Sequence, residues 1–274
     1  MTGFSLTLRQ SPPLRASLRG ILPTALSGLT AAQVAALPVG HGRANVALGE
    51  FFAVVPRDDD RLLLEGDLAR FDHLGWQLDG GSIEVRGGVG DHAGGAMSGG
   101  ELVVHGDARD LAGCEMAGGR LEIHGSVGDF AAGSLPGSLD GMRGGVLLVR
   151  GNAGQRLADR MRRGSLLVFG DVGDFAASRL VAGTLALGGR CGAHPGYGMR
   201  RGSVVLAGPE PRPSAPPTFV PAGADADVAW QLLARDLARL GGAGSVFAGL
   251  PQRRIRRWLG DLAAGGQGEL ILPE

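Results

Sequence analysis

A short phrase that recurs between Gly81 and Gly208 constrains the fold of this chain more than any other feature. Its clearest copies read GGELVVHGD from Gly99 and GGRLEIHGS from Gly118. Equivalent glycines follow one another at steps of 19 residues, apart from one step of 26. A fixed period of this size is typical of repeat proteins, in which stacked copies bury one continuous core. The glycines that mark the copies are Gly81, Gly100, Gly119, Gly145, Gly164, Gly183 and Gly202.

Inside each copy an apolar residue stands at every second position, as Leu121 and Ile123 do in one copy and Leu166 and Val168 in another. This period of two predicts a strand with one buried face. Two further ladders keep the same step and are predicted to point inward. They are Met97, Met116, Met142, Met161 and Met199 before the copies, and Val89, Ala108, Val127, Ala153, Val172 and Cys191 after them.

Parallel stacking of these copies predicts an all-β fold, a parallel, right-handed β-helix of about seven 19-residue coils with a short N-terminal cap and C-terminal helices. Glycine suits the corners of such coils, where φ is positive or two backbones crowd. One copy carries seven extra residues, about Ser134 to Asp140, which must leave the stack as a loop. That loop either contacts a partner or is an insertion that arose by sequence drift and has no function.

The repeat divides the chain into four predicted segments. Residues 1–60 lack the period and are expected to cap the first coil, whose bare edge would otherwise invite edge-to-edge aggregation. This cap is predicted to hold a short helix that Thr30 caps and that runs through Leu37, and a strand within Val46 to Val55. Residues 61–208 form the β-helix, residues 209–224 a proline-rich linker, and residues 225–274 a helical tail.

The linker and the tail carry their own signals. Proline cannot donate a ladder hydrogen bond, so the prolines after Gly208 are expected to end the stack. A first helix is predicted from Asp225 or Asp227 to Leu240, and a second amphipathic helix from Gln252 to Leu262. The linker prolines are Pro209, Pro211, Pro213, Pro216 and Pro217.

The charge balance limits the possible partners. The 27 basic residues are all arginines, and 27 acidic residues match them, so a neutral chain offers no broad surface for nucleic acid. We find no apolar run long enough to span a membrane and no signal peptide. Cys114 and Cys191 lie in different ladders four copies apart, too far for a disulfide. These features predict a cytoplasmic protein with free thiols.

The outward positions of the strands form two columns, and the first is rich in cations. Its neighbours are expected about 5 Å apart. One alternative is a cationic strip that binds a carboxylate-rich tail or an acidic subunit. The other is a solvated face without a function. Two imidazoles on a flat face lack converging ligands, so no metal site is predicted. We call the residues Arg86, His105, His124 and Arg150 the polar column; Phe169 follows them.

The second outward column becomes apolar in its later copies. It runs Glu84, Val103, Glu122, Leu148, Leu167, Ala186 and Val205. A bare patch of this kind is rare on monomers, so either the C-terminal helices or another chain must cover it. We predict a partner interface at the apolar strip, which comprises Leu148, Leu167, Phe169 and Val205.

Other polar residues suggest no catalysis. We find no catalytic triad, no zinc-binding spacing and no paired carboxylates in a recognisable cleft, and no catalytic residue is predicted. Aspartates recur at one corner, and local Asx-type hydrogen bonding within each corner suits this period better than calcium binding does. His194 and Tyr197 receive no mechanism. The corner aspartates are Asp91, Asp110, Asp129 and Asp174.

The repeated unit resembles a known β-helix. A typical copy has two glycines, alternating aliphatic residues, a closing glycine, a small apolar residue and a methionine before the next copy. This pattern resembles the repeat of the β-helix shared by the C subunit of formylmethanofuran dehydrogenase and the C-terminal domain of the large subunit of glutamate synthase. The resemblance covers about Arg61 to Gly208. A separate chain with a cap and a tail is more similar to the dehydrogenase subunit than to the glutamate synthase domain.

The resemblance implies a non-catalytic scaffold subunit of a hetero-oligomeric enzyme. One setting is the formyltransferase/hydrolase complex, which moves a formyl group from formyl-tetrahydromethanopterin to a methanofuran analogue and releases formate. The other is a molybdenum or tungsten formylmethanofuran dehydrogenase that reduces CO₂. The arginine-rich, lysine-free composition suggests a GC-rich bacterial genome and favours the first. An interaction module outside one-carbon metabolism stays open.

The resemblance also implies where the chemistry lies. Catalysis would belong to amidohydrolase-like, formyltransferase or molybdoenzyme-like chains, with zinc in another subunit and no cofactor bound by this chain. The methanofuran-type coenzyme has a glutamate-rich tail, which the polar column would contact.

Overall fold

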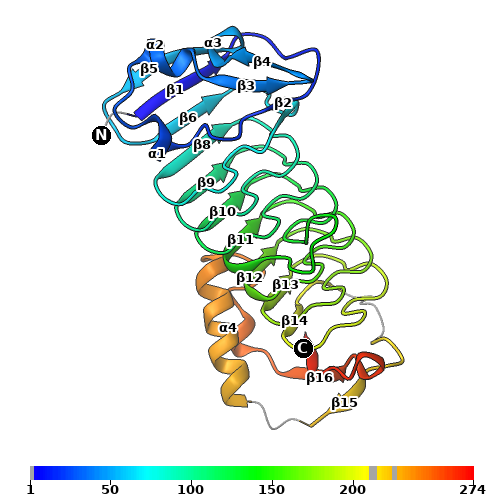
Figure 1. The fold of residues 1–274 in the computed structure, drawn as a ribbon. Helices are drawn as coiled ribbons and strands as arrows, with labels where there is room; N and C mark the ends of the chain where they lie inside the picture. Colours follow the sequence, from blue (N-terminus) through cyan, green and yellow to red (C-terminus); the bar gives the residue numbers. More distant parts are fainter. Residues whose placement is uncertain (1–2, 210–214, 224–226) are drawn as a thin grey trace.

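The computed structural model describes residues 3–209, 215–223 and 227–274 and is mostly β. Within these residues the strands form a mixed sheet of 13 strands and a second sheet of four (Figure 1). Helices are few, and the longest described is α4 (Asp227–Gly241). Pro211, Pro213 and Asp225, for which the sequence made predictions, lie outside the described residues.

Each repeat contributes one strand to the long sheet. Consecutive strands pair in parallel, and equivalent positions are aligned, so that Leu102 lies beside Leu121 and Leu121 beside Leu147. Figure 1 shows the repeats stacked along one axis. The strands are β6 (Leu62–Glu65), β8 (Ser82–Arg86), β9 (Glu101–Val104), β10 (Arg120–Ile123), β11 (Arg143–Val149), β12 (Arg163–Val168), β13 (Thr184–Leu187) and β14 (Ser203–Leu206).

The repeats are also bonded to one another away from this sheet. A ladder of parallel bridges runs from Leu68 to Cys191, one residue per repeat. On a further side, Gly113 N donates to Ala93 O at 2.8 Å, and Ala132 N donates to Ala112 O at 2.7 Å. Because every repeat pairs at several places with the next, the stack extends its backbone hydrogen bonding along its whole length.

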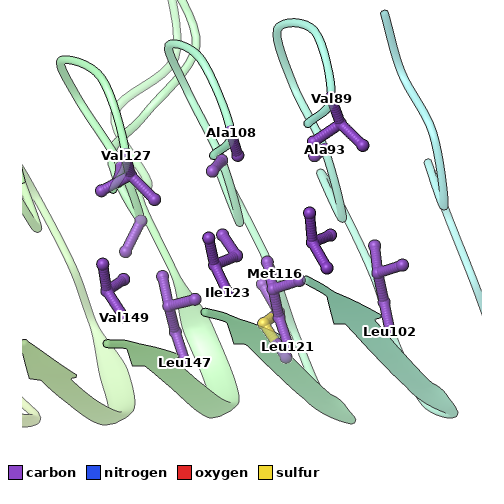
Figure 2. Close-up of a cluster of buried hydrophobic side chains, with 14 of the residues drawn as sticks. Val89, Ala93, Leu102, Ala108, Met116, Leu121, Ile123, Val127, Leu147 and Val149 are labelled. Atoms are coloured by element: carbon purple, nitrogen blue, oxygen red, sulfur yellow. The ribbon is translucent and has the colours of Figure 1, made fainter. Parts of the chain in front are cut away.

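The core lies inside the stacked repeats, as the sequence predicted. All five ladder methionines have no exposed surface, and the small residues after the closing glycines from Val89 to Val172 are at most 6% exposed. Figure 2 shows Leu102, Leu121 and Leu147 from successive strands pointing into this interior. Glycine at the corners has a steric cause, because a Cβ on Gly119 would lie 2.5 Å from the Gly99 carbonyl oxygen.

The N-terminal segment pairs with the first repeat. Strand β1 (Gly3–Leu8) is parallel to β6 and antiparallel to β5 (Phe52–Arg57). The predicted helix is α2 (Ala31–Ala35), with Thr30 and Gln33 forming a capping box. The predicted strand within Val46 to Val55 was wrong in part, because α3 (Leu48–Phe51) interrupts it. The other elements are α1 (Pro23–Leu26), β2 (Ala16–Ser17), β3 (Pro38–His41), β4 (Ala44–Ala47) and β7 (Phe71–Asp72).

The C-terminal segment corrects two predictions. The first helix is present, but residues Gln252 to Leu262 do not form a second helix: they contain the strand β16 (Ile255–Gly260), which pairs with β17 (Gly268–Pro273). Strand β17 lies parallel to β14, so the stack continues beyond the prolines. The prediction that the stack ends after Gly208 was therefore wrong, because the chain returns to it after α4. The remaining elements are β15 (Val220–Ala222), η1 (Leu250–Gln252) and η2 (Leu262–Ala264).

Among the described residues, no helix has both the length and the apolar character needed to cross a membrane.

Candidate functional site

The arginines of the polar column are paired with carboxylates. Arg86 donates from Nη1 to Glu65 Oε1 at 3.0 Å and from Nε to Glu84 Oε1 at 3.3 Å. Arg150 donates from Nη2 and Nε to Glu122 Oε1 at 2.8 and 3.0 Å. The column therefore has little uncompensated positive charge for an anionic ligand.

The two histidines of the polar column join the same network. Their Nδ1 atoms are 3.1 Å apart, so one ring donates and the other accepts. His105 Nε2 lies 3.2 Å from Glu84, and His124 Nε2 lies 3.5 Å from Glu122. Burial raises the pKa of Glu84, but hydrogen bonds from Arg86 and His105 outweigh it, and the pKa lies below its ordinary value. The result is an exposed, charge-balanced surface.

The apolar strip is covered by the chain itself, which corrects its prediction as a partner interface. Leu148, Leu167 and Val205 have no exposed surface and pack in one cluster with Trp230 of α4 and Phe247. Such burial stabilises each aliphatic side chain by about 1.5–3 kcal/mol. Of the two alternatives that the sequence left open, the C-terminal helix covers the strip.

Phe169 follows the polar column and packs against the buried cluster beneath α4. It is half-buried, with the Arg150 guanidinium 4.4 Å above its ring and the Phe247 ring 5.0 Å away. Arg150 also donates from Nη1 to the Gly241 carbonyl at 3.2 Å, at the end of α4. This arginine thus joins the polar column to the helix that covers the apolar strip.

The corner aspartates bond to the next repeat. Asp110 Oδ1 accepts from Asp129 N at 2.9 Å, and Asp174 Oδ1 accepts from Ala193 N at 2.7 Å. The predicted local Asx-type bonding was therefore wrong for these two carboxylates, which accept from the next repeat because the stacking places each of them beside the following corner. Asp91 is ion-paired with Arg109 at 3.0 Å. Over the described residues, no group of three or more His, Cys, Asp or Glu side chains is placed to hold a metal ion.

Both cysteines are free thiols in the structure, and Cys114 is buried. Burial raises the pKa of each thiol to about 12, which keeps both protonated near neutral pH.

The sequence reasoning missed a third column of large side chains. Each member has a positive φ between 55° and 62°. His73 and His92 stack with ring centroids 4.7 Å apart, and burial, together with Arg19 and His92, lowers the pKa of His73 to about 4. His194 stacks on Phe175 at 5.0 Å. The 19-residue step would have revealed this column, which comprises His73, His92, Leu111, Phe130, Arg156, Phe175 and His194.

Tyr197 and the insertion also lie beside this third column. Tyr197 packs edge-on against Phe175 at 6.0 Å and is 57% exposed. The insertion lines a hollow of about 390 Å³ together with Leu111 and Phe130. The structure thus gives neighbours to a residue and a loop that the sequence left without a role.

The sequence reasoning also missed a hollow of about 890 Å³ on another side of the stack. Its signal was present, since the pairs Arg162-Arg163 and Arg200-Arg201 stand directly before the marker glycines of their copies. The arginines that line it are Arg143, Arg162, Arg163, Arg200 and Arg201.

Comparisons relate the chain to known proteins. The GXGXG motif family matches residues 66–212. The Fhc C subunit of the formyltransferase/hydrolase complex of Methylorubrum extorquens is 42% identical over 86 residues, which span 31% of this chain and 32% of that protein. A chain of the X-ray crystal structure of the formyltransferase/hydrolase complex (FhcABCD) from Methylorubrum extorquens, in complex with methylofuran, matches with a TM-score of 0.91 and 41% identity. That match covers 98% of this chain and 99% of the other.

Proposed function

Because this chain belongs to the GXGXG motif family and matches a chain of a formyltransferase/hydrolase complex over 98% of its length, we propose that it is the C subunit of such a complex. The complex would transfer a formyl group from formyl-tetrahydromethanopterin to a methanofuran analogue and hydrolyse the product to formate. The nearly full-length structural match carries this proposal, and the curated relative, itself a C subunit, agrees with it.

We propose that the repeat region is a right-handed parallel β-helix. Support comes from the parallel pairing of β6 and β8 through β14 in chain order, and from the parallel bridges between Leu68 and Cys191 on another side. A rod of this kind is stiff, because each repeat is bonded to both neighbours. Such a rod suits a scaffold that holds other chains at fixed separations.

In this role the chain is non-catalytic and holds partner subunits in the cytoplasm. The proposed partners are formyltransferase and amidohydrolase-like chains, the latter carrying zinc. The coenzyme of the complex would be of the methylofuran type, since the solved relative was crystallised with methylofuran. The pKa of about 12 for both thiols is consistent with a structural role for the cysteines.

We propose that the polar column contacts a partner subunit. Its histidines and Arg86 are exposed, and its charges are already balanced by Glu84 and Glu122. A balanced network can exchange hydrogen bonds with polar groups of another protein. It is less suited to a polyanionic coenzyme tail, which needs free positive charge.

Purification of the tagged chain from its own host tests the assembly. Formyltransferase and amidohydrolase-like subunits, together with formate release from formyl-tetrahydromethanopterin, are the expected result. Iron-sulfur and molybdopterin or tungstopterin subunits would instead favour CO₂ reduction. A chain that purifies alone would contradict the proposal.

A matched pair of variants tests the polar column. Arg86→Glu reverses a charge in the column, whereas Arg109→Glu does so at a corner with similar exposure, 58% against 56%. We expect Arg86→Glu to weaken subunit retention about tenfold and Arg109→Glu to leave it unchanged. Equal retention in both variants would remove the column from the interface. An intact Arg86→Glu complex with a raised KM for the formyl acceptor would instead support contact with the coenzyme tail.

A further inference from the structure

The third column of side chains changes character along the stack. Imidazoles stand at its two ends, whereas its middle holds Leu111, Phe130, Arg156 and Phe175. These four side chains are half-buried, and none of them belongs to the cluster of buried residues inside the repeats. The middle of the third column is therefore a largely apolar surface on the outside of the stack.

The backbone at these positions does not favour large side chains. All four residues have φ between 55° and 61°, a conformation that glycine, asparagine and aspartate adopt more readily than bulky residues do. The repeats use glycine two residues further on, at Gly94 and Gly113, where φ is also positive. Because the core is filled by other ladders, folding does not require rings at the third column. A departure of this kind from local preference is expected at functional surfaces.

The insertion makes a hollow beside this part of the column. The hollow has a volume of about 390 Å³ and lies between Leu111 and Phe130 of the column and Leu135 and Pro136 of the insertion. We call it the insertion hollow. Leu135 N donates to Glu115 Oε1 at 3.4 Å, which ties the insertion to the preceding repeat. The apolar walls of the hollow thus come from two repeats and from the one segment that breaks the 19-residue period.

Two arginines of the insertion hollow are already paired. The Asp159 side chain is buried and accepts from Arg179 Nη2 at 2.8 and 3.0 Å, and Arg160 Nε lies 3.7 Å from its second oxygen. Two guanidinium groups therefore share one carboxylate. This pair leaves the surface around the hollow with a positive balance of charge.

Arg156 differs from these two arginines. Its guanidinium carbon lies 5.2 Å from the centroid of the Phe175 ring and 5.9 Å from that of Phe130. Among residues 3–209, 215–223 and 227–274, no hydrogen bond or ion pair engages this guanidinium. Stacking between two rings holds the planar group in place and leaves its donors available to a carboxylate.

The length of the surface suits a polypeptide. From Leu111 to His194 the column rises four repeats, which corresponds to about 19 Å along the stack at the usual strand spacing. Tyr197, which is 57% exposed, extends the surface beside Phe175. About six residues of extended chain span that distance, and their side chains point to one face at every second position. A polyanion would not match a surface on which apolar and aromatic side chains prevail.

We infer that the middle of the third column and the insertion hollow bind one extended segment of a partner subunit. An apolar side chain of that segment enters the hollow, and a single carboxylate pairs with Arg156. The inference rests on the proposed function, because it assigns a docking surface within that assembly. Aromatic rings and an arginine are the residues that most often carry the binding energy of protein interfaces.

The double variant Leu111→Asn/Phe130→Asn tests the docking surface in the complex purified from its host. Dilution followed by mass photometry gives the apparent Kd of each subunit, and we expect this Kd to rise about tenfold for one partner. The melting temperature of the isolated chain should change by less than about 4 °C, because asparagine adopts a positive φ more readily than leucine or phenylalanine does. A merely structural role would lower the melting temperature and leave the Kd unchanged.

The matched control is Val228→Asn/Leu232→Asn. It removes two apolar side chains that are 76% and 64% exposed on α4, the helix that covers the outward face of the long sheet. We expect the apparent Kd of every subunit to stay within about twofold of wild type. An equal rise in both double variants would overturn the inference, because it would indicate a general loss of apolar surface. An unchanged Kd in Leu111→Asn/Phe130→Asn would overturn it as well.

Photochemical cross-linking in the intact complex identifies the occupant. With Phe130→p-benzoylphenylalanine, we expect a cross-link to a partner peptide that carries an apolar residue and an aspartate or glutamate within about six residues of it. Arg156→Glu should raise the apparent Kd of the same partner about tenfold, because it places two carboxylates together. A cross-link to a second copy of this chain, or to no protein, would overturn the inference.

These experiments separate the inference from the proposed function. If the wild-type chain purifies alone, the proposed complex itself is wrong. If the wild-type complex contains formyltransferase and amidohydrolase-like subunits and the Leu111→Asn/Phe130→Asn complex keeps them with equal affinity, only the docking surface is wrong.

Discussion

The outward face of the long sheet has two halves that share one backbone geometry and differ in their surfaces. In β8 to β10 the outward side chains are mainly charged residues and histidines, which pair with one another in contact with solvent. In β11 to β14 the equivalent column is Leu148, Leu167, Ala186 and Val205, all fully buried beneath α4. The strand pairing continues unbroken between the halves, since Glu122 lies directly beside Leu148.

The difference teaches that the repeat specifies the core and leaves the outer face free. Inward positions must be apolar in every copy, because they face the same interior. Outward positions carry no such restriction, so one half is a polar surface and the other is the apolar surface against which α4 packs. Burial makes the second half a source of stability, whereas exposed ion pairs contribute little.

The largest effect on stability is expected where a polar side chain replaces an apolar one in the buried half of the outward face. Leu167→Gln should lower the free energy of unfolding by about 3–6 kcal/mol, because it removes a buried aliphatic side chain and leaves an amide without partners. Urea unfolding measures the change. The matched control is Val103→Gln at the equivalent half-exposed position of β9, for which we expect less than about 1 kcal/mol. Similar losses of unfolding free energy in the two variants would show that α4 does not shield the outward side chains of β11 to β14 from solvent.

An intermediate effect is expected at the boundary between the halves. Glu122→Gln should cost about 1–2 kcal/mol, because the carboxylate accepts hydrogen bonds from Arg150 and Arg120 and its side chain is only 13% exposed. Burial raises the pKa of Glu122, but these hydrogen bonds outweigh it, so the folded pKa lies below the unfolded one.

The pH dependence of this stability difference follows from that direction. The difference between wild type and Glu122→Gln should be complete above the unfolded pKa of the carboxyl group. It should then diminish as the pH falls through the folded pKa, where the wild-type carboxyl group becomes neutral. Unfolding measured over an acid pH series would reveal this. A difference that grows toward acid pH would contradict the assigned charge state.

The smallest effect is expected in the exposed half. Arg86→Gln should change the free energy of unfolding by less than about 0.5 kcal/mol, because its side chain is 58% exposed and its ion pairs are solvated. Thermal unfolding at low and high salt is the measurement. A loss above about 1 kcal/mol would place the polar column among the stabilising contacts of the rod.

Much of the stack could be predicted from sequence because its signals are local and repeated. Met116, Leu121 and Ile123 are fully buried as the alternation required, and α4 ends within one residue of its predicted end at Leu240. The tail was harder, because Ile255, Trp258 and Leu259 follow the helical spacing i, i+3, i+4, although these residues form a strand. Strand β16 forms because β17 lies beside it, and that pairing depends on where the chain returns.

The candidate sites show the same division. The residues of the polar column were identified by position alone, but their neutralisation by Glu65, Glu84 and Glu122 depends on rotamers that a pattern does not encode. The arginine-lined hollow escaped prediction, although its arginine pairs are visible before the marker glycines, because its walls come from three repeats and from a loop after β16. No local sequence pattern predicts that Arg201 and Gln267 line the same hollow.

The sequence by itself determined the repeat, the inward residues and the parallel order of the strands, because a fixed step with alternating apolar residues can bury them in only one kind of stack. Only the tertiary structure decided what covers the apolar strip and which arginines line the hollow of about 890 Å³. Both depend on residues 215–223 and 227–274, whose strand β17 joins the sheet beside β14 and which supply α4 and one wall of the hollow. Such long-range packing is set by which surfaces remain unburied once the local structure has formed.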